Sequence, residues 1–239
     1  MLDFAHIART LDTIRSHKDG HLRSIKTIER LPTPDENSWS LEEITQLNLS
    51  ELPVFKHVNS LYICDCRKLT SLSIIAEKFP QLHNLLIYSS DRLTSLDGLQ
   101  SLQELQTLTI WPSFSGSISL ESFKPLTDIT TLRSLVFSGK CIDGSLAPLY
   151  GLKHLQHMFL SNNFNWEEFA NFERHQPHVN FCWKGGVVYD ANPAILQCKK
   201  CNKAQAMLTG RGKKLCCPDC DAKRLEKHLR DYSSLSSAH

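Results

Sequence analysis

Leucines and other apolar residues recur along the chain in a short pattern, L-x-x-L-x-L. Five copies place their second apolar residue at Leu61, Leu85, Leu108, Leu135 and Met158, separated by 24, 23, 27 and 23 residues. The second and third apolar residues of each copy flank one other residue, and this alternation is the period of a β-strand with one buried face. The pattern therefore predicts five strands, each followed by a return segment, stacked as the turns of a solenoid.

Two weaker copies flank this set. An earlier copy reads Ile44-x-x-Leu47-x-Leu49, and a later one ends in Val179-x-Phe181. The distance from Leu47 to Leu61 is 14 residues, so the first copy is less regular than the rest. The 27-residue interval contains the segment 111–116 (WPSFSG), which predicts a loop insertion.

The five central copies resemble leucine-rich repeat proteins, and the resemblance covers residues 41–183. It implies an α/β fold with a parallel sheet on the concave side and return segments that close the core behind it. One repeat cannot bury its own leucines, so neighbouring repeats must stack and the two ends need caps. Residues 1–40 predict an N-terminal helical cap, because Leu2, Ala5, Ala8 and Leu11 fit an amphipathic helix broken at Asp19–Gly20.

The residues that point away from the core of the predicted strands include several aromatic and aliphatic side chains. We predict partner contacts from Tyr62, Tyr88, Trp111, Val136, His157 and Phe159. Exposed aromatic residues clustered on a rigid sheet are typical of protein-binding hot spots. The alternative is that another segment of the same chain covers this face.

Two histidines, His157 and His178, hold equivalent positions in consecutive repeats. Stacked imidazoles could bind a metal ion or respond to pH. Histidines at solvated strand edges are common, however, and the spacing provides no carboxylate or cysteine to complete a site.

The distribution of cysteine residues and of charged residues changes near residue 184. Of the nine cysteines, five lie between residues 198 and 220. Residues 1–183 carry 16 basic and 20 acidic side chains, whereas residues 184–239 carry 11 basic and 5 acidic ones, within a total net charge of +2. The sequence therefore predicts a cap (1–40), a repeat solenoid (41–183) and a small C-terminal module (184–239) of different chemistry.

The C-terminal module contains two C-x-x-C pairs, Cys198–Cys201 and Cys217–Cys220, with 15 residues between them. This spacing is typical of a zinc site, and the segment between the pairs centres on a two-glycine turn, so the module resembles a zinc ribbon. Cys216 could replace Cys217 as a ligand, but only Cys217 preserves the C-P-x-C spacing. Because four thiolates leave no open coordination position, we predict a structural Zn²⁺ ion.

The same module is predicted to carry a basic surface. Its candidate residues are Lys199, Lys200, Arg211, Lys213 and Lys214. Such a surface suits nucleic acid or an acidic protein equally well, although no aromatic residue between 191 and 231 could stack on bases. Residues 221–232 predict a helix that packs on the ribbon or on the last repeat.

Location and chemistry can also be predicted. No apolar run is long enough to span a membrane, and the first twenty residues carry charges without an apolar core, so we expect neither a membrane anchor nor a signal peptide. An odd number of cysteines argues against a disulfide framework and for a cytoplasmic location. Nucleophile-elbow, H-E-x-x-H and phosphate-loop motifs do not occur, so no enzymatic activity is expected.

These observations predict a non-catalytic protein whose concave face binds a protein partner. Small irregular leucine-rich repeat proteins of this size are similar to bacterial proteins found beside secreted toxins. By that resemblance, a toxin effector is a candidate partner and an immunity protein, or toxin inhibitor, is a candidate function. The alternatives are a nucleic-acid-associated factor that uses the basic module, and an intracellular adaptor.

Overall fold

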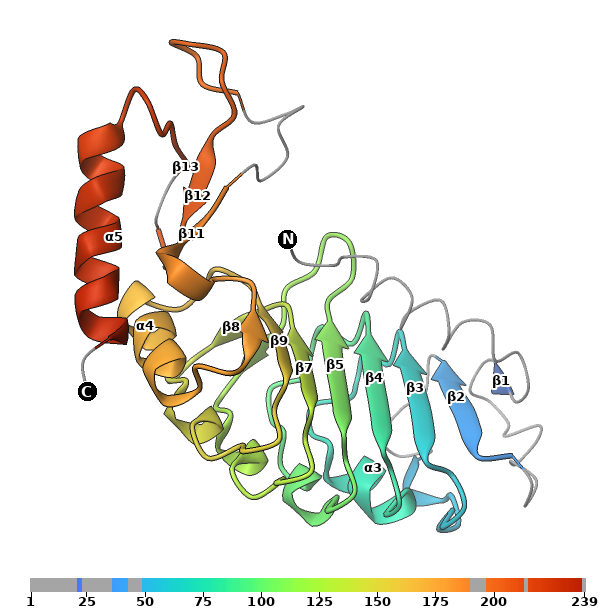
Figure 1. The fold of residues 1–239 in the computed structure, drawn as a ribbon. Helices are drawn as coiled ribbons and strands as arrows, with labels where there is room; N and C mark the ends of the chain where they lie inside the picture. The colour runs from blue at the N-terminus through green and yellow to red at the C-terminus, as the bar shows by residue number, and fades with distance from the viewer. Residues whose placement is uncertain (1–20, 23–35, 43–48, 190–196, 213–214, 238–239) are drawn as a thin grey trace.

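A computed structural model of the protein describes residues 21–22, 36–42, 49–189, 197–212 and 215–237. The predicted N-terminal helix lies outside these residues. The described chain winds as a curved solenoid and ends in a small sheet and a long helix (Figure 1).

The solenoid is built on an eight-stranded sheet in the order β1-β2-β3-β4-β5-β7-β9-β10, in which every pair of neighbours is parallel. Leu61, Leu85, Leu108 and Leu135 stand side by side in register, so the predicted repeat strands are confirmed. The strands are β1 (His21–Leu22), β2 (Ser38–Glu42), β3 (Ser60–Cys64), β4 (Asn84–Tyr88), β5 (Thr107–Trp111), β7 (Ser134–Phe137), β9 (His157–Leu160) and β10 (Asn180–Phe181).

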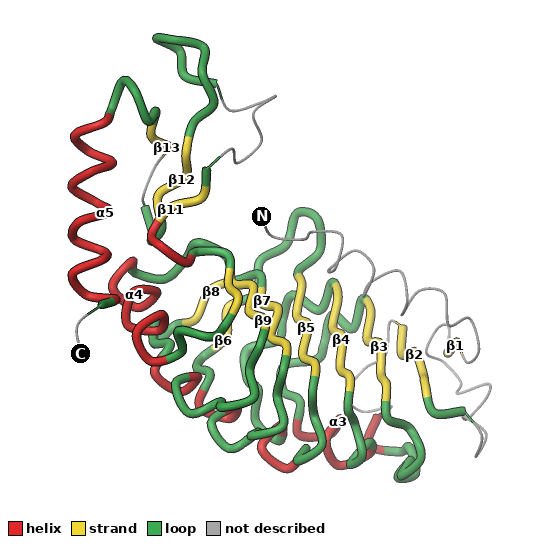
Figure 2. Tube along the Cα trace, in the orientation of Figure 1, coloured by secondary structure: helices red, strands yellow, loops and turns green. Residues whose placement is uncertain are grey.

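Short helices and turns form the opposite side of the solenoid (Figure 2). They are α3 (Ser73–Lys78), η1 (Leu99–Ser101), η2 (Lys124–Leu126), η3 (Ala147–Leu149) and α4 (Trp166–His175). A second, two-stranded sheet pairs β6 (Ser119–Leu120) with β8 (Lys140–Cys141). The return segments pack closely against the sheet because they bury leucines of their own; the segment between β4 and β5, for example, buries Leu93, Leu96 and Leu99.

The core lies between the sheet and the return segments and forms one continuous cluster from Trp39 to Tyr232. Leu108 and Leu135 are fully buried in it, each against the equivalent residue of the next turn. Burying a leucine side chain contributes about 2 kcal/mol, and an isolated turn would leave its leucines in water. The turns are therefore stable as a stack and not singly.

The first repeat strand differs from the sequence prediction. The sequence places it at Ile44–Leu49, but the structure places it at β2, where Trp39 pairs with Leu61 and Leu41 with Ile63. Leu49 is buried in a helical turn instead. The bulky Trp39 takes the place of the expected leucine, and the spacing of 22 residues from Trp39 to Leu61 matches the later turns.

After β10 the chain forms a separate three-stranded antiparallel sheet. The turn η4 (Lys184–Gly186) leads into β11 (Val187–Val188), which pairs with β12 (Ala206–Leu208), which in turn pairs with β13 (Leu215–Cys216). The helix α5 (Ala222–Ser236) then runs back to the solenoid and lies beside α4 (Figure 1). We call residues 184–237 the C-terminal module.

Hydrogen bonds with the Asn162 side chain and with the backbone of Phe164 attach the turn between β12 and β13 to the last repeat. The Asn162 side chain accepts a hydrogen bond from the Gly210 N–H (2.6 Å) and donates one to the Leu208 carbonyl (2.9 Å). The Arg211 N–H donates to the Phe164 carbonyl (2.6 Å). Gly210 has φ +111°, and a Cβ at this position would lie 2.6 Å from the Cβ of Trp166. A glycine is therefore required where the module touches the solenoid.

Helix α5 closes the end of the solenoid core. Tyr232 is 1% exposed, and its hydroxyl donates to the Glu173 carboxylate (3.0 Å). The same carboxylate oxygen accepts the Gly185 N–H (2.9 Å). One turn away, the His228 Nε2 donates to the Gly186 carbonyl (2.9 Å). The predicted helix thus packs on the last repeat, where Tyr232 and His228 contact Trp166 and the Tyr232 hydroxyl lies near the Trp183 carbonyl.

Replacing Gly210 by alanine should destabilise the protein more than replacing Gly212. Gly212 also has a positive φ (+70°), but no atom lies within 4 Å of its would-be Cβ, so Gly212→Ala should cost about 1–2 kcal/mol from backbone strain alone. Gly210→Ala adds the clash with Trp166 and should cost more. Urea unfolding of both variants measures the difference, and equal losses would contradict the junction described here.

Candidate metal centre and binding face

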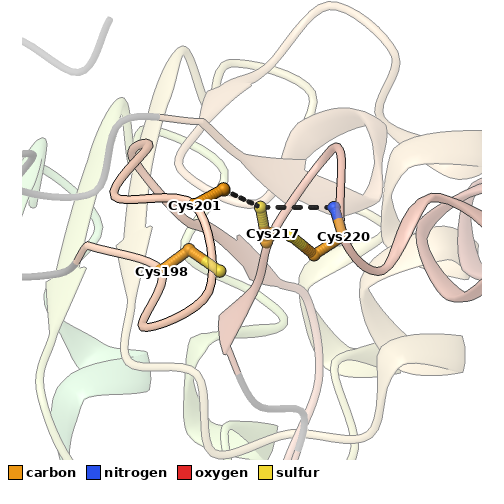
Figure 3. A group of neighbouring side chains, drawn as sticks. All are labelled: Cys198, Cys201, Cys217 and Cys220. Carbon is orange, nitrogen blue, oxygen red and sulfur yellow. Dashed lines mark hydrogen bonds between the residues drawn. The ribbon is translucent and has the colours of Figure 1, made fainter.

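The two C-x-x-C pairs come together in the C-terminal module. The sulfur atoms of Cys198, Cys201, Cys217 and Cys220 all lie within 4.8 Å of one another (Figure 3). The Cys201 and Cys217 sulfurs are 3.5 Å apart. Cys198 and Cys217 are buried, Cys201 is half-buried and Cys220 is exposed. Four soft ligands that converge in this way could hold one metal ion.

The first pair is placed by a tight backbone turn. The Cys198 N–H donates to the Lys203 carbonyl and the Asn202 N–H donates to the Cys198 carbonyl, both at 2.8 Å. Asn202 adopts φ +57°, a left-handed conformation that asparagine tolerates better than most residues. This turn points both sulfurs of the pair to the same side.

The second pair is placed by the start of α5. The Cys217 N–H donates to the Asp221 carboxylate (3.1 Å), and the Asp221 N–H donates back to the Cys217 carbonyl (2.9 Å). The Cys220 N–H points at the Cys217 sulfur (3.4 Å). A salt bridge of 2.5 Å between Lys203 and Asp219 links the two pairs at the surface.

Cys216 lies outside the cluster. Its side chain is fully buried beside Leu208 and Leu225 in a small hydrophobic core, and its sulfur donates weakly to the Asp221 carbonyl (3.7 Å). Cys216 ends β13, so it and Cys217 point in opposite directions. The spacing selects Cys217, and the structure places the sulfur of Cys217, and not that of Cys216, among the four that converge.

The electrostatics of the cluster favour a cation. The backbone N–H groups of Lys200 and Cys201 point at the Cys198 sulfur and lower the pKa of this thiol to about 7. In contrast, the hydrogen bond with the Cys201 sulfur raises the pKa of Cys220 to about 12. Hydrogen bonds between the thiols thus oppose ionisation of Cys220, with a smaller contribution from repulsion by the Cys198 thiolate. A divalent cation between the sulfurs would remove that repulsion.

The predicted partner-binding residues gather on the concave side of the sheet. Tyr62, Tyr88, Trp111 and Phe159 are half-buried there, and His157 is exposed. Tyr88 and Trp111 are direct neighbours in the register of β4 and β5. Val136 is 8% exposed and therefore buried, as is Leu86 on the same face. The middle of the concave face is thus less exposed to solvent than the sequence alone indicates.

The rings of Trp111 and Phe159 stack with centroids 5.5 Å apart and an interplanar angle of 29°. Their strands, β5 and β9, are separated by β7, so the two backbones are about 10 Å apart. The rings must therefore lean toward each other across β7, where Val136 lies. This pair forms the aromatic platform of the concave face.

One exposed residue was missed by the sequence prediction. Phe114 is fully exposed at the tip of the loop after β5. The loop is anchored because the Asp91 carboxylate accepts hydrogen bonds from the Ser113 N–H (2.9 Å) and the Ser113 hydroxyl. The 27-residue repeat interval signals the loop, but the Asp91 anchor comes from the preceding turn and has no signature in the sequence.

The predicted basic surface is partly described. Lys199, Lys200 and Arg211 are exposed, whereas Lys213 and Lys214 lie outside the described residues. The paired histidines His157 and His178 do not take part in a metal-binding group: in the described part of the chain, the four cysteines form the group able to hold a metal. None of the described helices is long and apolar enough to cross a membrane.

No protein-family model and no curated protein matches the chain. Among solved structures, the chain is similar to an internalin from Listeria monocytogenes, with 18% sequence identity and a TM-score of 0.35. The match covers 62% of this chain and 41% of the internalin chain, so this chain spans less than half of that length.

Replacing Cys217 by alanine should abolish tight metal binding, whereas Cys216→Ala should leave it intact, because Cys217 alone of the two belongs to the sulfur cluster. Titration with Co²⁺, whose thiolate charge-transfer absorption reports the number of sulfur ligands, distinguishes the two variants. If Cys216→Ala lost the absorption and Cys217→Ala kept it, the ligand assignment would be wrong.

Proposed function

We propose that this protein is a non-catalytic binding protein: its concave face holds a protein partner, and its four cysteines hold a structural zinc ion. The observation that carries the first part is the aromatic platform of Trp111 and Phe159 with Tyr88 beside it. The observation that carries the second part is the convergence of four sulfurs.

Zinc is the metal that best suits the donor set. Structural zinc sites with four cysteines are tetrahedral with Zn–S bonds of about 2.3 Å, which places the sulfurs about 3.8 Å apart. Sulfurs that all lie within 4.8 Å of one another need to move little to reach that arrangement. The short antiparallel strands around the two C-x-x-C turns also suit a zinc ribbon. With all four positions taken by thiolates, no site is open for water or substrate, so the ion would serve the fold.

The concave face is suited to a protein partner rather than to a small molecule. Its aromatic rings lie on parallel strands whose spacing is fixed by backbone hydrogen bonds, so they lose little conformational freedom on binding. Half-buried tryptophan, tyrosine and phenylalanine side chains offer large apolar contact areas, which is the composition of interface hot spots. The adjacent Phe114 loop extends this apolar surface beyond the sheet.

The identity of the partner stays a prediction. A bacterial toxin, which would make the protein an immunity protein, is one candidate partner; the other candidate function is that of an intracellular adaptor. Both use the same face, so the first question is whether that face binds a protein at all.

A double variant, Tyr88→Asp plus Trp111→Asp, should lose a partner that the natural protein captures. The two carboxylates would place negative charge on the aromatic platform. The affinity for the partner should fall at least tenfold, which corresponds to about 1.4 kcal/mol of binding free energy. Capture from native lysate after nuclease treatment, with mass spectrometry of the retained proteins, measures this and identifies the partner.

The matched control is Gln100→Asp plus Gln103→Asp. It makes the same charge change at exposed positions on the return side of the solenoid and should retain the partner. Circular dichroism of both variants checks that they are folded. Retention of the partner by the aromatic variant, or its equal loss from both variants, would contradict the assignment to the concave face.

A further inference from the structure

The C-terminal module has many more exposed cations than its acidic residues can neutralise. Of its four described acidic residues, Asp219 pairs with Lys203 (2.5 Å) and Asp231 pairs with Lys227 (2.6 Å). The carboxylate of Asp221 accepts the Cys217 N–H instead. Glu226 is the one acidic side chain left over in residues 197–212 and 215–237.

Within residues 197–212 and 215–237, six cations form no ion pair with any described acidic residue, and all six are exposed. They are Lys199, Lys200, Arg211, Lys223, Arg224 and Arg230. Holding so many like charges on a small module without partners raises its electrostatic energy. An anionic partner would lower that energy.

Five of these cations lie on two segments that meet at the sulfur cluster, whereas Arg211 lies apart from them, in the turn between β12 and β13. Lys199 and Lys200 lie inside the first C-x-x-C turn, and Lys223 and Arg224 lie just after Cys220 at the start of α5. Farther along α5, Arg230 stands seven residues from Lys223, which places both on one helix face about 10 Å apart. This face is opposite to the one that buries Leu225, His228 and Tyr232, and α5 lies at the outer side of the molecule (Figure 1).

The surface lacks what a protein interface needs. The large exposed hydrophobic residues of the described chain are Val54, Phe114, Ile142 and Tyr189, and none of them lies in residues 197–237. Protein interfaces depend on apolar anchors at their centre, whereas binding to a phosphate backbone needs exposed lysine and arginine alone. Because residues 197–212 and 215–237 expose no aromatic ring that could stack on bases, a double-stranded nucleic acid suits the surface better than a single strand.

We propose that the outer surface of the C-terminal module, formed by Lys199, Lys200, Lys223, Arg224 and Arg230, binds the phosphate backbone of duplex nucleic acid without sequence preference. This function is separate from partner binding at the concave face. The protein would thereby bring its protein partner to nucleic acid.

Binding of the zinc-loaded full chain to a fluorescein-labelled 20-base-pair DNA duplex, followed by fluorescence anisotropy over a series of KCl concentrations, tests the proposal. Four to six phosphate contacts predict a plot of log K against log [KCl] with a slope of about −4 to −5. Two duplexes of unrelated sequence should bind equally, and single-stranded DNA should bind more weakly.

Two variants locate the surface. Lys199→Ala plus Lys200→Ala, and Lys223→Ala plus Arg230→Ala, should each weaken binding about tenfold at low salt and reduce the slope by about 2. The control, Lys68→Ala plus Lys153→Ala, removes the same charge from exposed positions of the solenoid and should change neither quantity. Metal content and circular dichroism confirm that each variant is folded.

Three results would overturn the proposal: no binding of the duplex at low salt, equal loss of binding in the control variant, or binding of polyglutamate as tight as that of DNA, which would indicate an acidic protein partner. The variant Tyr88→Asp plus Trp111→Asp should bind DNA normally. Because this variant changes the concave face alone, loss of the protein partner with normal DNA binding would show that the two functions are separate, so that one proposal can fail without the other.

Discussion

The whole structure depends on one constraint: a turn of the solenoid buries its leucines only against the next turn. In the middle of the stack this condition is met by identical neighbours, as where Leu85, Leu108 and Leu135 stand in register. At the C-terminal end, β10 is the last of the described strands in the sheet. There, α4 and the Tyr232 side chain of α5 complete the core, and the continuous cluster of buried residues runs through to Tyr232.

The sulfur cluster is part of this closure. Helix α5 begins at the second cysteine pair and ends on α4, while the turn between β12 and β13 is bonded to Asn162 and Phe164. The four sulfurs therefore converge where the first turn of α5 lies next to the end of the small sheet that is away from the solenoid. A metal ion bound there would hold the helix and the sheet together. Such a small sheet buries too little surface to be stable alone, and zinc binding of about 10–16 kcal/mol in apparent free energy would supply what it lacks.

Much of this fold could be predicted from the sequence because its determinants are local and periodic. The strand positions follow from alternating apolar residues, and Cys217 could be distinguished from Cys216 by ligand spacing. The rest depends on contacts between distant residues. The first strand was misplaced because Trp39 does not match the repeat pattern, and the burial of Val136 results from rings on two other strands that lean over it. The hydrogen bond from Tyr232 to Glu173 likewise joins segments 59 residues apart.

Residue-level amide hydrogen exchange of the zinc-loaded protein, before and after addition of a strong chelator, tests the account most directly. The account predicts that protection is lost in β12, β13 and α5, whereas the central strands β4, β5 and β7 keep theirs, because their leucines are buried by neighbouring turns on both sides. Unchanged protection in α5 and β12 after removal of the metal would contradict the role given to the sulfur cluster. Simultaneous loss of protection throughout the chain would contradict the separation of the module from the central turns.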